Sequence, residues 1–291
     1  MSTHTATLST MFRYPIKSCA GQSLTQVEVT ALGLERDRHW VIVDDSGRFQ
    51  TQRQIPHLVW IQTALSEQSL TLSAPSQPNL TIPLATEHST SSRITIWNDR
   101  VSAFDLGDEV VQWLDNYLQI PGRHFRLVQF NPEHPRLCDT IWLGADFNPQ
   151  FQPRYHPFTD AYSVNILSQA SVDHLNERLQ ENGLETIGIE RFRPNLVLSD
   201  VPAHAEDQMK HLTFTRGDET LVLEVIRPCT RCQIPEIDPW TAMREPGITD
   251  VLSEYRRAAS MGEAICFGMQ AVVHSGAPFL LQTGEFNYSL R

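Results

Sequence analysis

TLVLEVIRPCTRC, residues 220–232, joins a β-strand to a turn that carries two cysteines. Residues 220–226 are rich in Leu, Val and Ile, which is typical of a strand with a buried face. The following segment places Cys229 and Cys232 three residues apart, with Arg227 and Arg231 beside them. The sequence therefore predicts that a strand ends here and presents a thiol among cations.

The Cys-x-x-Cys spacing has two explanations that use both sulfurs. It could be half of a tetrahedral zinc site, which Cys266 and a histidine such as His274 would have to complete. It could also be a thioredoxin-like redox pair, which requires a helix to begin at the first cysteine. Prolines follow closely at positions 235 and 239 and disfavour a long helix.

Two further explanations need only one sulfur or none. One cysteine could be a reactive or metal-ligating thiolate, since neighbouring arginines favour the ionised form of a thiol. Alternatively, both cysteines could be small hydrophobic side chains packed in a loop. The segment alone leaves all four explanations open.

The rest of the chain is predicted to be mainly β with a few packed helices (α+β). Regularly spaced strand patterns, typical of a barrel or sandwich, occupy residues 8–13, 39–44, 48–53, 58–63, 70–73, 80–84, 93–97, 196–198, 220–226, 269–274 and 279–282. Apolar residues at helical spacing predict helices over residues 108–118 and 171–179, and a third that Thr249 would cap. Residues 129–157 are rich in Pro, Asn and Gln, so we expect two units, 1–130 and 131–291.

Composition limits the classes of partner and compartment. The formal net charge of −11 argues against binding to nucleic acid or to an anionic membrane. No signal peptide and no apolar run of spanning length is visible, and five cysteines, an odd number, do not form a disulfide framework. We expect a cytoplasmic protein with reduced thiols.

Cations occur in four short segments at predicted strand ends. Of 23 basic residues, 21 are arginines, whose planar fork suits oxyanions. The segments are Tyr14-Pro15-Ile16-Lys17-Ser18, Glu35-Arg36-Asp37-Arg38, Arg191-Phe192-Arg193-Pro194-Asn195 and the Cys229–Cys232 turn with its two arginines. In the second, strand alternation would put Arg36 and Arg38 on one side, facing either one anion or water. Together the four segments favour a shared site for a small anionic ligand in an acidic protein.

In their order and spacing these segments resemble the MOSC family, named for the C-terminal domain of molybdenum-cofactor sulfurases. The resemblance runs from about residue 8 to 284 and is closest to members with an N-terminal MOSC β-barrel region, such as amidoxime-reducing components and reductases of N-hydroxylated bases. Its further markers are Thr51-Gln52-Arg53-Gln54, Ile166-Leu167-Ser168-Gln169-Ala170-Ser171 and Phe267-Gly268. The resemblance implies an N-terminal β-barrel-like subdomain followed by a MOSC β-barrel domain.

The resemblance also implies a molybdenum cofactor, Mo-molybdopterin, whose metal is held by Cys232 as both ligand and catalytic residue. Soft thiolate ligation suits such a metal. The implied cofactor-binding residues are Lys17, Ser18, Arg38, Arg53, Asp160, Ala161, Tyr162, Arg193, Asn195, Thr230 and Arg231. The loop of residues 160–162 is expected to act through backbone groups. Pro235 and Glu236 depart from the family pattern after the cysteine, which leads us to expect an extra carboxylate near the metal.

The implied function is the reduction of small N-hydroxylated substrates: hydroxylamines, amidoximes and N-hydroxylated bases. No iron–sulfur motif and no N-terminal anchor is visible in the sequence, so electrons are expected from a separate flavin reductase, ferredoxin-like or cytochrome-type partner. The first alternative is a non-catalytic carrier of the molybdenum cofactor or of sulfur. The second is a zinc-stabilised or plain β-rich interaction module.

Overall fold

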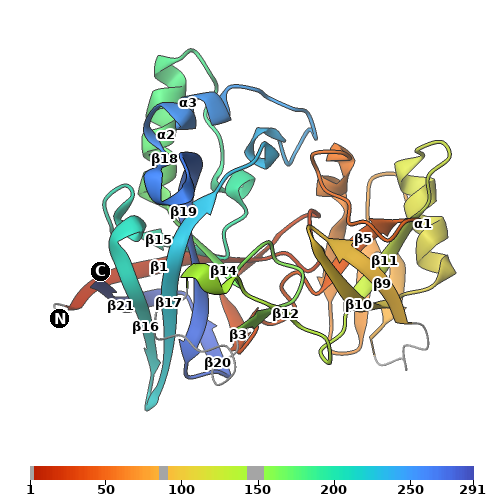
Figure 1. Cartoon of the computed structure of the whole chain (residues 1–291), viewed down its shortest axis with the longest axis horizontal. Helices are drawn as coiled ribbons and strands as arrows, with labels where there is room; N and C mark the ends of the chain where they lie inside the picture. Colours follow the sequence, from red (N-terminus) through yellow and green to blue (C-terminus); the bar gives the residue numbers. More distant parts are fainter. Residues whose placement is uncertain (1–2, 85–90, 143–153) are drawn as a thin grey trace.

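The computed structural model describes residues 3–84, 91–142 and 154–291. Two β-rich assemblies lie side by side along the longest axis of the molecule (Figure 1). Three α-helices accompany the strands in the described residues, so the prediction of a mainly β fold with few helices is confirmed.

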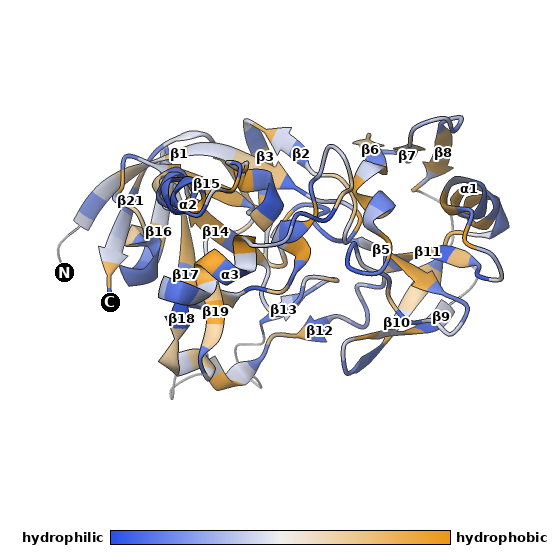
Figure 2. Cartoon of the chain, turned by 90° about the horizontal axis from the view of Figure 1, so that it is seen from above, coloured by the Kyte–Doolittle hydropathy of each residue, from blue (hydrophilic) through white to orange (hydrophobic). Residues whose placement is uncertain are grey.

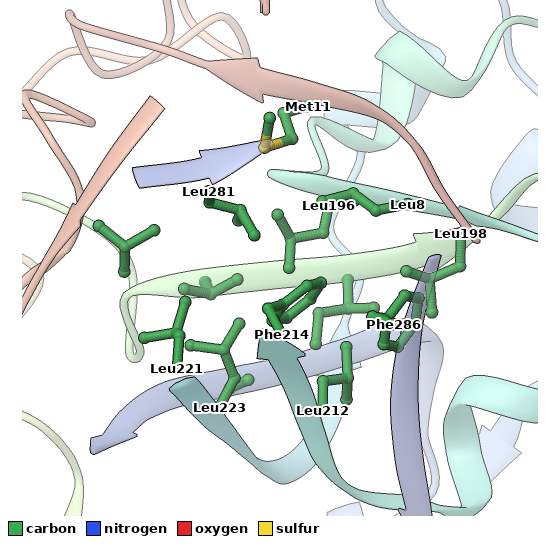
Figure 3. Close-up of a cluster of buried hydrophobic side chains, with 14 of the residues drawn as sticks. Leu8, Met11, Leu196, Leu198, Leu212, Phe214, Leu221, Leu223, Leu281 and Phe286 are labelled. Atoms are coloured by element: carbon green, nitrogen blue, oxygen red, sulfur yellow. The ribbon is translucent and has the colours of Figure 1, made fainter. Parts of the chain in front are cut away.

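The larger assembly is a closed barrel of seven strands. In order around the barrel these are β14 (Val164–Ser168), β15 (Leu196–Ser199), β1 (Thr3–Arg13), β21 (Gly284–Leu290), β16 (Met209–Arg216), β17 (Glu219–Thr230) and β19 (Ala264–Ser275). Antiparallel pairing of β19 with β14 closes the ring. Alternate side chains point inward and fill it, among them Leu8, Leu196 and Phe214 (Figure 3).

The smaller assembly contains two sheets and the first helix. One sheet has the order β5 (Trp40–Asp44), β11 (Phe125–Phe130), β10 (Asp99–Asp105) and β9 (Ser91–Ile96); the other comprises β6 (Gln62–Leu65), β7 (Ser69–Ser73) and β8 (Leu80–Pro83). Helix α1 (Asp108–Leu118) has the predicted bounds and buries Val110, Trp113 and Leu114 in the core between the two sheets. Figures 1 and 2 show α1 at the end of the molecule far from the barrel.

Short strands tie the beginning of the chain to its end. Strand β2 (Gln22–Leu24) pairs antiparallel with the end of β1, while β3 (Gln26–Thr30) pairs with β4 (Gly33–Leu34) and with β20 (Phe279–Gln282). The first 34 residues thus pair mainly with strands of the second half. The division after residue 130 stays a prediction, and part of the predicted loop, including Phe147-Asn148-Pro149-Gln150, lies outside the described residues. Its described flanks carry β12 (Arg136–Leu137) and β13 (Tyr155–His156).

Helices α2 (Gln169–Glu181) and α3 (Ile248–Tyr255) pack on the outside of the barrel. The Ser168 hydroxyl caps α2 by accepting a hydrogen bond from the backbone N–H of Ser171. The predicted cap of α3 is wrong, because Gly247 occupies that position. Thr249 lies inside the helix, and its hydroxyl donates a hydrogen bond to the Glu236 carboxylate. The short strand β18 (Arg257–Ala258) follows α3 and pairs with β19.

Two strand predictions are wrong. Residues 48–53 follow a tight turn at Gly47 but make only isolated bridges, because Gln50 and Arg48 turn back onto the Asp44 carboxylate. Residues 58–60 belong to η1 (Pro56–Trp60), a 3-10 helix that begins at a proline, and only β6 follows as a strand. In each case local side-chain and proline geometry overrides an apolar pattern that strands and 3-10 turns share.

Candidate functional site

A pocket of about 420 Å³ lies between the barrel and the smaller assembly. All twelve residues that the sequence nominated contribute to its lining. They are Lys17, Ser18, Arg38, Arg53, Asp160, Ala161, Tyr162, Arg193, Asn195, Thr230, Arg231 and Cys232. Segments up to 215 residues apart in sequence therefore meet at one cavity (232 − 17 = 215).

Lys17 and Asp160 form an ion pair across the pocket wall. The Lys17 ammonium lies 2.5 Å from Asp160 Oδ1 and also donates to the carbonyl of Phe158. Desolvation would raise the pKa of the Asp160 carboxyl, but the Lys17 charge and the indole N–H of Trp97 outweigh it and hold that pKa well below its usual range. Burial lowers the pKa of Lys17, which the Asp160 charge opposes. The Asp160 side chain thus pairs with Lys17 at the pocket, while the expected role of the backbone groups of residues 160–162 stays a prediction.

Arg38 joins the two assemblies. Its guanidinium pairs with the buried Asp37 carboxylate, donates to Asn195 Oδ1 at 2.9 Å and donates to the Arg193 carbonyl at 3.1 Å. Arg36 points elsewhere, to the backbone carbonyls of Ser66 and its neighbour Glu67. The alternation argument fails because both arginines have left-handed backbone conformations (φ 59° and 51°) and are not in a strand.

Arg193 supplies a partly buried cation without a counter-ion in the described structure. It ends the 3-10 helix η3 (Ile189–Phe192) in a left-handed conformation with φ 53°, and its guanidinium lies 4.1 Å from the ring centre of Tyr14. Its Nη2 atom is buried and has no hydrogen-bond partner among the described residues. Burial lowers the pKa of Arg193 to about 10, still far above neutrality. An orphaned donor on a pocket-lining cation is suited to an anionic ligand.

Arg227 and Arg231 follow the sequence expectation that cations surround the cysteine turn. Arg227 donates to the Gln270 side chain, and Arg231 donates to the carbonyls of Phe267 and Phe192. These partners are neutral, so both charges remain uncompensated. Gly268 has φ 75° and allows β19 to approach β14 closely, because a Cβ there would lie 2.6 Å from the Ile166 carbonyl oxygen.

The cysteines differ in accessibility. Cys232 is exposed, whereas Cys229 and the other three are buried. Burial raises the pKa of the Cys229 thiol, an effect that the Arg231 charge opposes. Cys229 lies within β17 and does not begin a helix, which removes the thioredoxin-like geometry.

A zinc site is also unsupported by the geometry. Across residues 3–84, 91–142 and 154–291, no group of three or more His, Cys, Asp or Glu side chains is arranged to hold a metal ion. His274, the suggested fourth ligand, instead lies 3.4 Å from the Glu224 carboxylate. Cys229 and Cys232 both line the pocket, and of the two only Cys232 is an exposed soft donor.

The charge at the pocket is strongly positive. Seven cations line it, and Asp160 is the only lining carboxylate in the described chain. Lys17, Arg38 and Arg191 have acidic partners, but no ion pair with a described residue occupies the remaining four: Arg53, Arg193, Arg227 and Arg231. A ligand that carries several negative charges would neutralise them.

Sequence reasoning did not nominate several lining residues. They are Thr51, Trp97, Thr159, Asn165, Arg191, Phe192, Cys229, Ile234, Pro235, Arg227 and Gln270, of which Thr51, Arg191, Phe192, Arg227, Cys229 and Pro235 were noticed without being assigned a cofactor role. Trp97 follows β9, and the Arg53 guanidinium lies 5.1 Å from the centre of its ring. An aromatic residue in a polar turn was the available signal for Trp97.

Glu236 does not bring a carboxylate into the pocket. Its side chain is 3% exposed and is held by Arg244, at 2.9 Å, and by the Thr249 hydroxyl. The expectation of an extra acid near the metal is therefore wrong, because this carboxylate anchors the segment that leads to α3. Pro235 and Ile234, its neighbours, do line the pocket.

In the part of the chain that the structure describes, no helix is long and apolar enough to cross a membrane.

Comparison with known proteins identifies two domains. The MOSC N-terminal beta barrel domain matches residues 5–121, and the MOSC domain matches residues 153–285. Mitochondrial amidoxime-reducing component 1 from Mus musculus is 33% identical over 98% of this chain and 82% of its own length. Mitochondrial amidoxime reducing component 2 from Bos taurus is 33% identical over 86% of this chain and 72% of its own length.

Molybdenum cofactor sulfurase from Danio rerio is 32% identical over 86% of this chain but only 30% of its own length. Similarity to proteins of these names links the chain to molybdenum-cofactor-related function. The chain belongs to the family of MOSC-domain proteins that also carry the MOSC N-terminal β-barrel domain.

Proposed function

We propose that this protein binds a pterin molybdenum cofactor in the pocket, with Cys232 as the thiolate ligand, and reduces small N-hydroxylated compounds. The observation that carries the proposal is one exposed thiol in a pocket with four uncompensated arginines. The relatives named as amidoxime-reducing components supply the reaction class.

The residues present fit such a group. A pterin cofactor is anionic through its phosphate, and the orphaned Arg193 Nη2 atom together with Arg53, Arg227 and Arg231 can satisfy several oxyanions. Ser18 adds a hydroxyl at the same wall, beside Lys17. Cys232 is a soft donor, which suits a metal of this type.

Each residue has a role that its contacts support. Arg38 and Asn195 hold the two assemblies together at the pocket and so orient the cations around an anion. Arg231 fixes the turn that presents Cys232, since it donates hydrogen bonds to carbonyls on two other segments, and Thr230 pairs with Cys266 at the end of β17. When bound, the cofactor would supply two-electron redox chemistry at its metal.

Asp160 has features that fit a role in substrate binding. Lys17 and Trp97 both donate to its Oδ1 atom, while Oδ2 has no hydrogen-bond partner among the described residues. The side chain is 59% exposed in the open pocket. An ionised carboxylate with a free oxygen can accept hydrogen bonds from the N–H groups of an amidoxime or a hydroxylated base.

Electrons would come from a separate donor protein of the flavin reductase, ferredoxin-like or cytochrome type. The test is a reconstituted assay with molybdenum-loaded protein, a donor chain and either benzamidoxime or N-hydroxylaminopurine. We expect reduction to the amidine or the amine, and none with Cys232→Ala. Absence of product from fully loaded wild-type protein with every donor class would overturn the proposal.

A second candidate function is a non-catalytic carrier of the cofactor or of sulfur. It is favoured by the similarity to molybdenum cofactor sulfurase and by the exposure of Cys232, since a carrier must release its cargo. A carrier would transfer cofactor to an apo-molybdoenzyme, or hold labile sulfur on Cys232, without turnover of any N-hydroxylated substrate.

A further inference from the structure

A β-hairpin of residues 236–245 follows Cys232 and lies next to the pocket. Its two arms are joined by hydrogen bonds from Asp238 N to Met243 O (2.9 Å) and from Glu245 N to Glu236 O (2.7 Å). At the tip, Trp240 is 79% exposed, and its carbonyl accepts a hydrogen bond from Trp60 of the smaller assembly. The segment between β17 and α3 thus reaches from the barrel toward the other assembly (Figure 1).

Arg191 binds both arms of this hairpin. Its Nη2 atom lies 2.6 Å from an oxygen of Asp238 on the first arm and 2.5 Å from an oxygen of Glu245 on the second. Its Nη1 atom donates to the Pro235 carbonyl at 3.3 Å. The Arg191 side chain is 5% exposed and Asp238 is 14% exposed, so their contact is largely shielded from water, whereas the Glu245 side chain is half exposed.

The two carboxylates distinguish Arg191 from the other arginines of the pocket. They already compensate its charge, whereas Arg193 has no counter-ion among the described residues. Arg191 is therefore poorly suited to binding an anionic ligand, although it contributes to the lining. Its contacts instead control where the chain after Cys232 runs.

Two apolar residues link the position of the hairpin to the shape of the pocket. Ile234 and Pro235 connect the Cys232 turn to the hairpin and form a wall of the cavity beside the thiol. Pro235 is held directly by Arg191, and the hairpin beyond it is held at both arms. A shift of the hairpin would move this wall relative to Cys232.

We infer that Arg191 is a positioning residue, which clamps the 236–245 hairpin so that Ile234 and Pro235 form a fixed apolar wall for the substrate. The inference deepens the proposed function and rests on it for the class of substrate. The wall suits the hydrocarbon or aryl part of an N-hydroxylated compound. Without Arg191, the two carboxylates that shared one nitrogen atom would repel each other, and the hairpin would loosen.

The experiment compares Arg191→Gln with Arg256→Gln. Arg256 is a matched control, because its guanidinium is also largely buried and pairs with one carboxylate, Asp207, but does not line the pocket. Hydrogen exchange of apoprotein should show faster exchange in residues 236–245 only for Arg191→Gln. Alkylation of the Cys232 thiol by a neutral reagent should also accelerate only in that variant.

In loaded protein, Arg191→Gln should raise KM for benzamidoxime about tenfold while kcat changes less than about threefold, because positioning is lost and the metal ligand is not. In Arg191→Lys the increase in KM should be smaller than in Arg191→Gln, since an ammonium can pair with the two carboxylates but lacks the planar fork of a guanidinium. Glu245→Gln, which removes the more exposed partner, gives a milder form of the same change if Arg191→Gln does not fold.

Unchanged hairpin exchange and unchanged Cys232 alkylation in Arg191→Gln and Glu245→Gln would overturn the inference. Equal loss of kcat and of bound molybdenum would also overturn it, because Arg191 would then serve the cofactor. If wild-type protein reduces no N-hydroxylated compound, the proposed function fails alone. The exchange and alkylation results still decide whether Arg191 clamps the wall.

Discussion

The guanidinium of Arg38 donates a hydrogen bond to Oδ1 of Asn195, at 2.9 Å and across 157 positions of sequence. The same oxygen accepts from the backbone N–H of Asn165, and the Asn195 amide donates to the Phe12 carbonyl. The buried Asn195 side chain, in the loop before β15, therefore connects β1, β14 and the loop before β5 at the edge of the pocket.

Replacement of Asn195 should destabilise the fold. Asn195→Leu leaves buried donors on Arg38 and Asn165 and a buried acceptor on Phe12 without partners, so we expect a loss of about 2–4 kcal/mol in the free energy of unfolding. Urea denaturation measures it. Asn116→Leu, at an exposed position, should change stability by less than about 0.5 kcal/mol, and equal losses in both variants would contradict this role.

Arg193 and Arg38 should respond differently to replacement by methionine. Arg193→Met removes a partly buried charge without a described counter-ion, so apoprotein stability should stay constant or rise by about 1 kcal/mol while cofactor loading falls. Arg38→Met strands the buried Asp37 carboxylate and should cost about 3–5 kcal/mol. Thermal denaturation and molybdenum content separate the two effects. Normal loading of Arg193→Met would show that its guanidinium does not bind the cofactor.

Cys232 should be the cysteine that reacts first. It is exposed while the other four cysteines are buried, so brief iodoacetamide treatment of folded apoprotein should label this residue and block later loading with molybdenum cofactor. Peptide mapping identifies the labelled site. Loaded protein should resist the reagent. Equal labelling of loaded and apo forms would mean that the metal does not cover this thiol.

His156 makes folding sensitive to acid. Burial, then the charges of Arg136 and Lys17, lower the pKa of His156 from 6.5 to about 3. The folded protein therefore keeps a neutral imidazole, and stability is fully present above pH 6.5. As the pH falls from 6.5 toward 3, the unfolded chain binds a proton that the folded protein does not, and stability drops by up to about 1.4 kcal/mol per pH unit.

His156→Gln should flatten this decline. Urea midpoints at pH 7, 6 and 5 measure the slope, and His134→Gln at an exposed position should leave it unchanged. The amide of glutamine can still bond to the Thr159 hydroxyl, which lies 2.6 Å from His156 Nδ1. Parallel slopes for wild type and His156→Gln would show that this histidine titrates alike in both states.

Short motifs made the pocket predictable from sequence. Segments such as Lys17-Ser18 and Thr230-Arg231-Cys232 are local in sequence, and the family resemblance predicts that they share one site. The structure places all of them on the pocket wall, while their chemical roles stay predictions. The pairing of β1 with β21 was not predictable, because an antiparallel partner at the far end of the chain leaves no local pattern.

Other features could not be predicted from the sequence because they depend on tertiary contacts. Arg191 appeared as one more cation of its segment, and nothing in the sequence shows that Asp238 and Glu245 compensate it. Glu236 appeared as an acid near the metal, but Arg244 and Thr249 turn it away. The side chains of Arg36 and Arg38 point in different directions, because neither residue has the strand geometry that an alternation argument assumes.

Molybdenum per chain, measured by mass spectrometry on protein from a cofactor-competent host, tests the central claim most directly. We predict about one molybdenum in wild type and in Cys229→Ala, none in Cys232→Ala, and no zinc in any of them, because one soft thiolate holds the metal. Cys229→Ala is the matched control, since it removes the buried thiol three residues earlier. Molybdenum retained in Cys232→Ala would contradict the account. Zinc bound to wild type and lost equally in both variants would also contradict it.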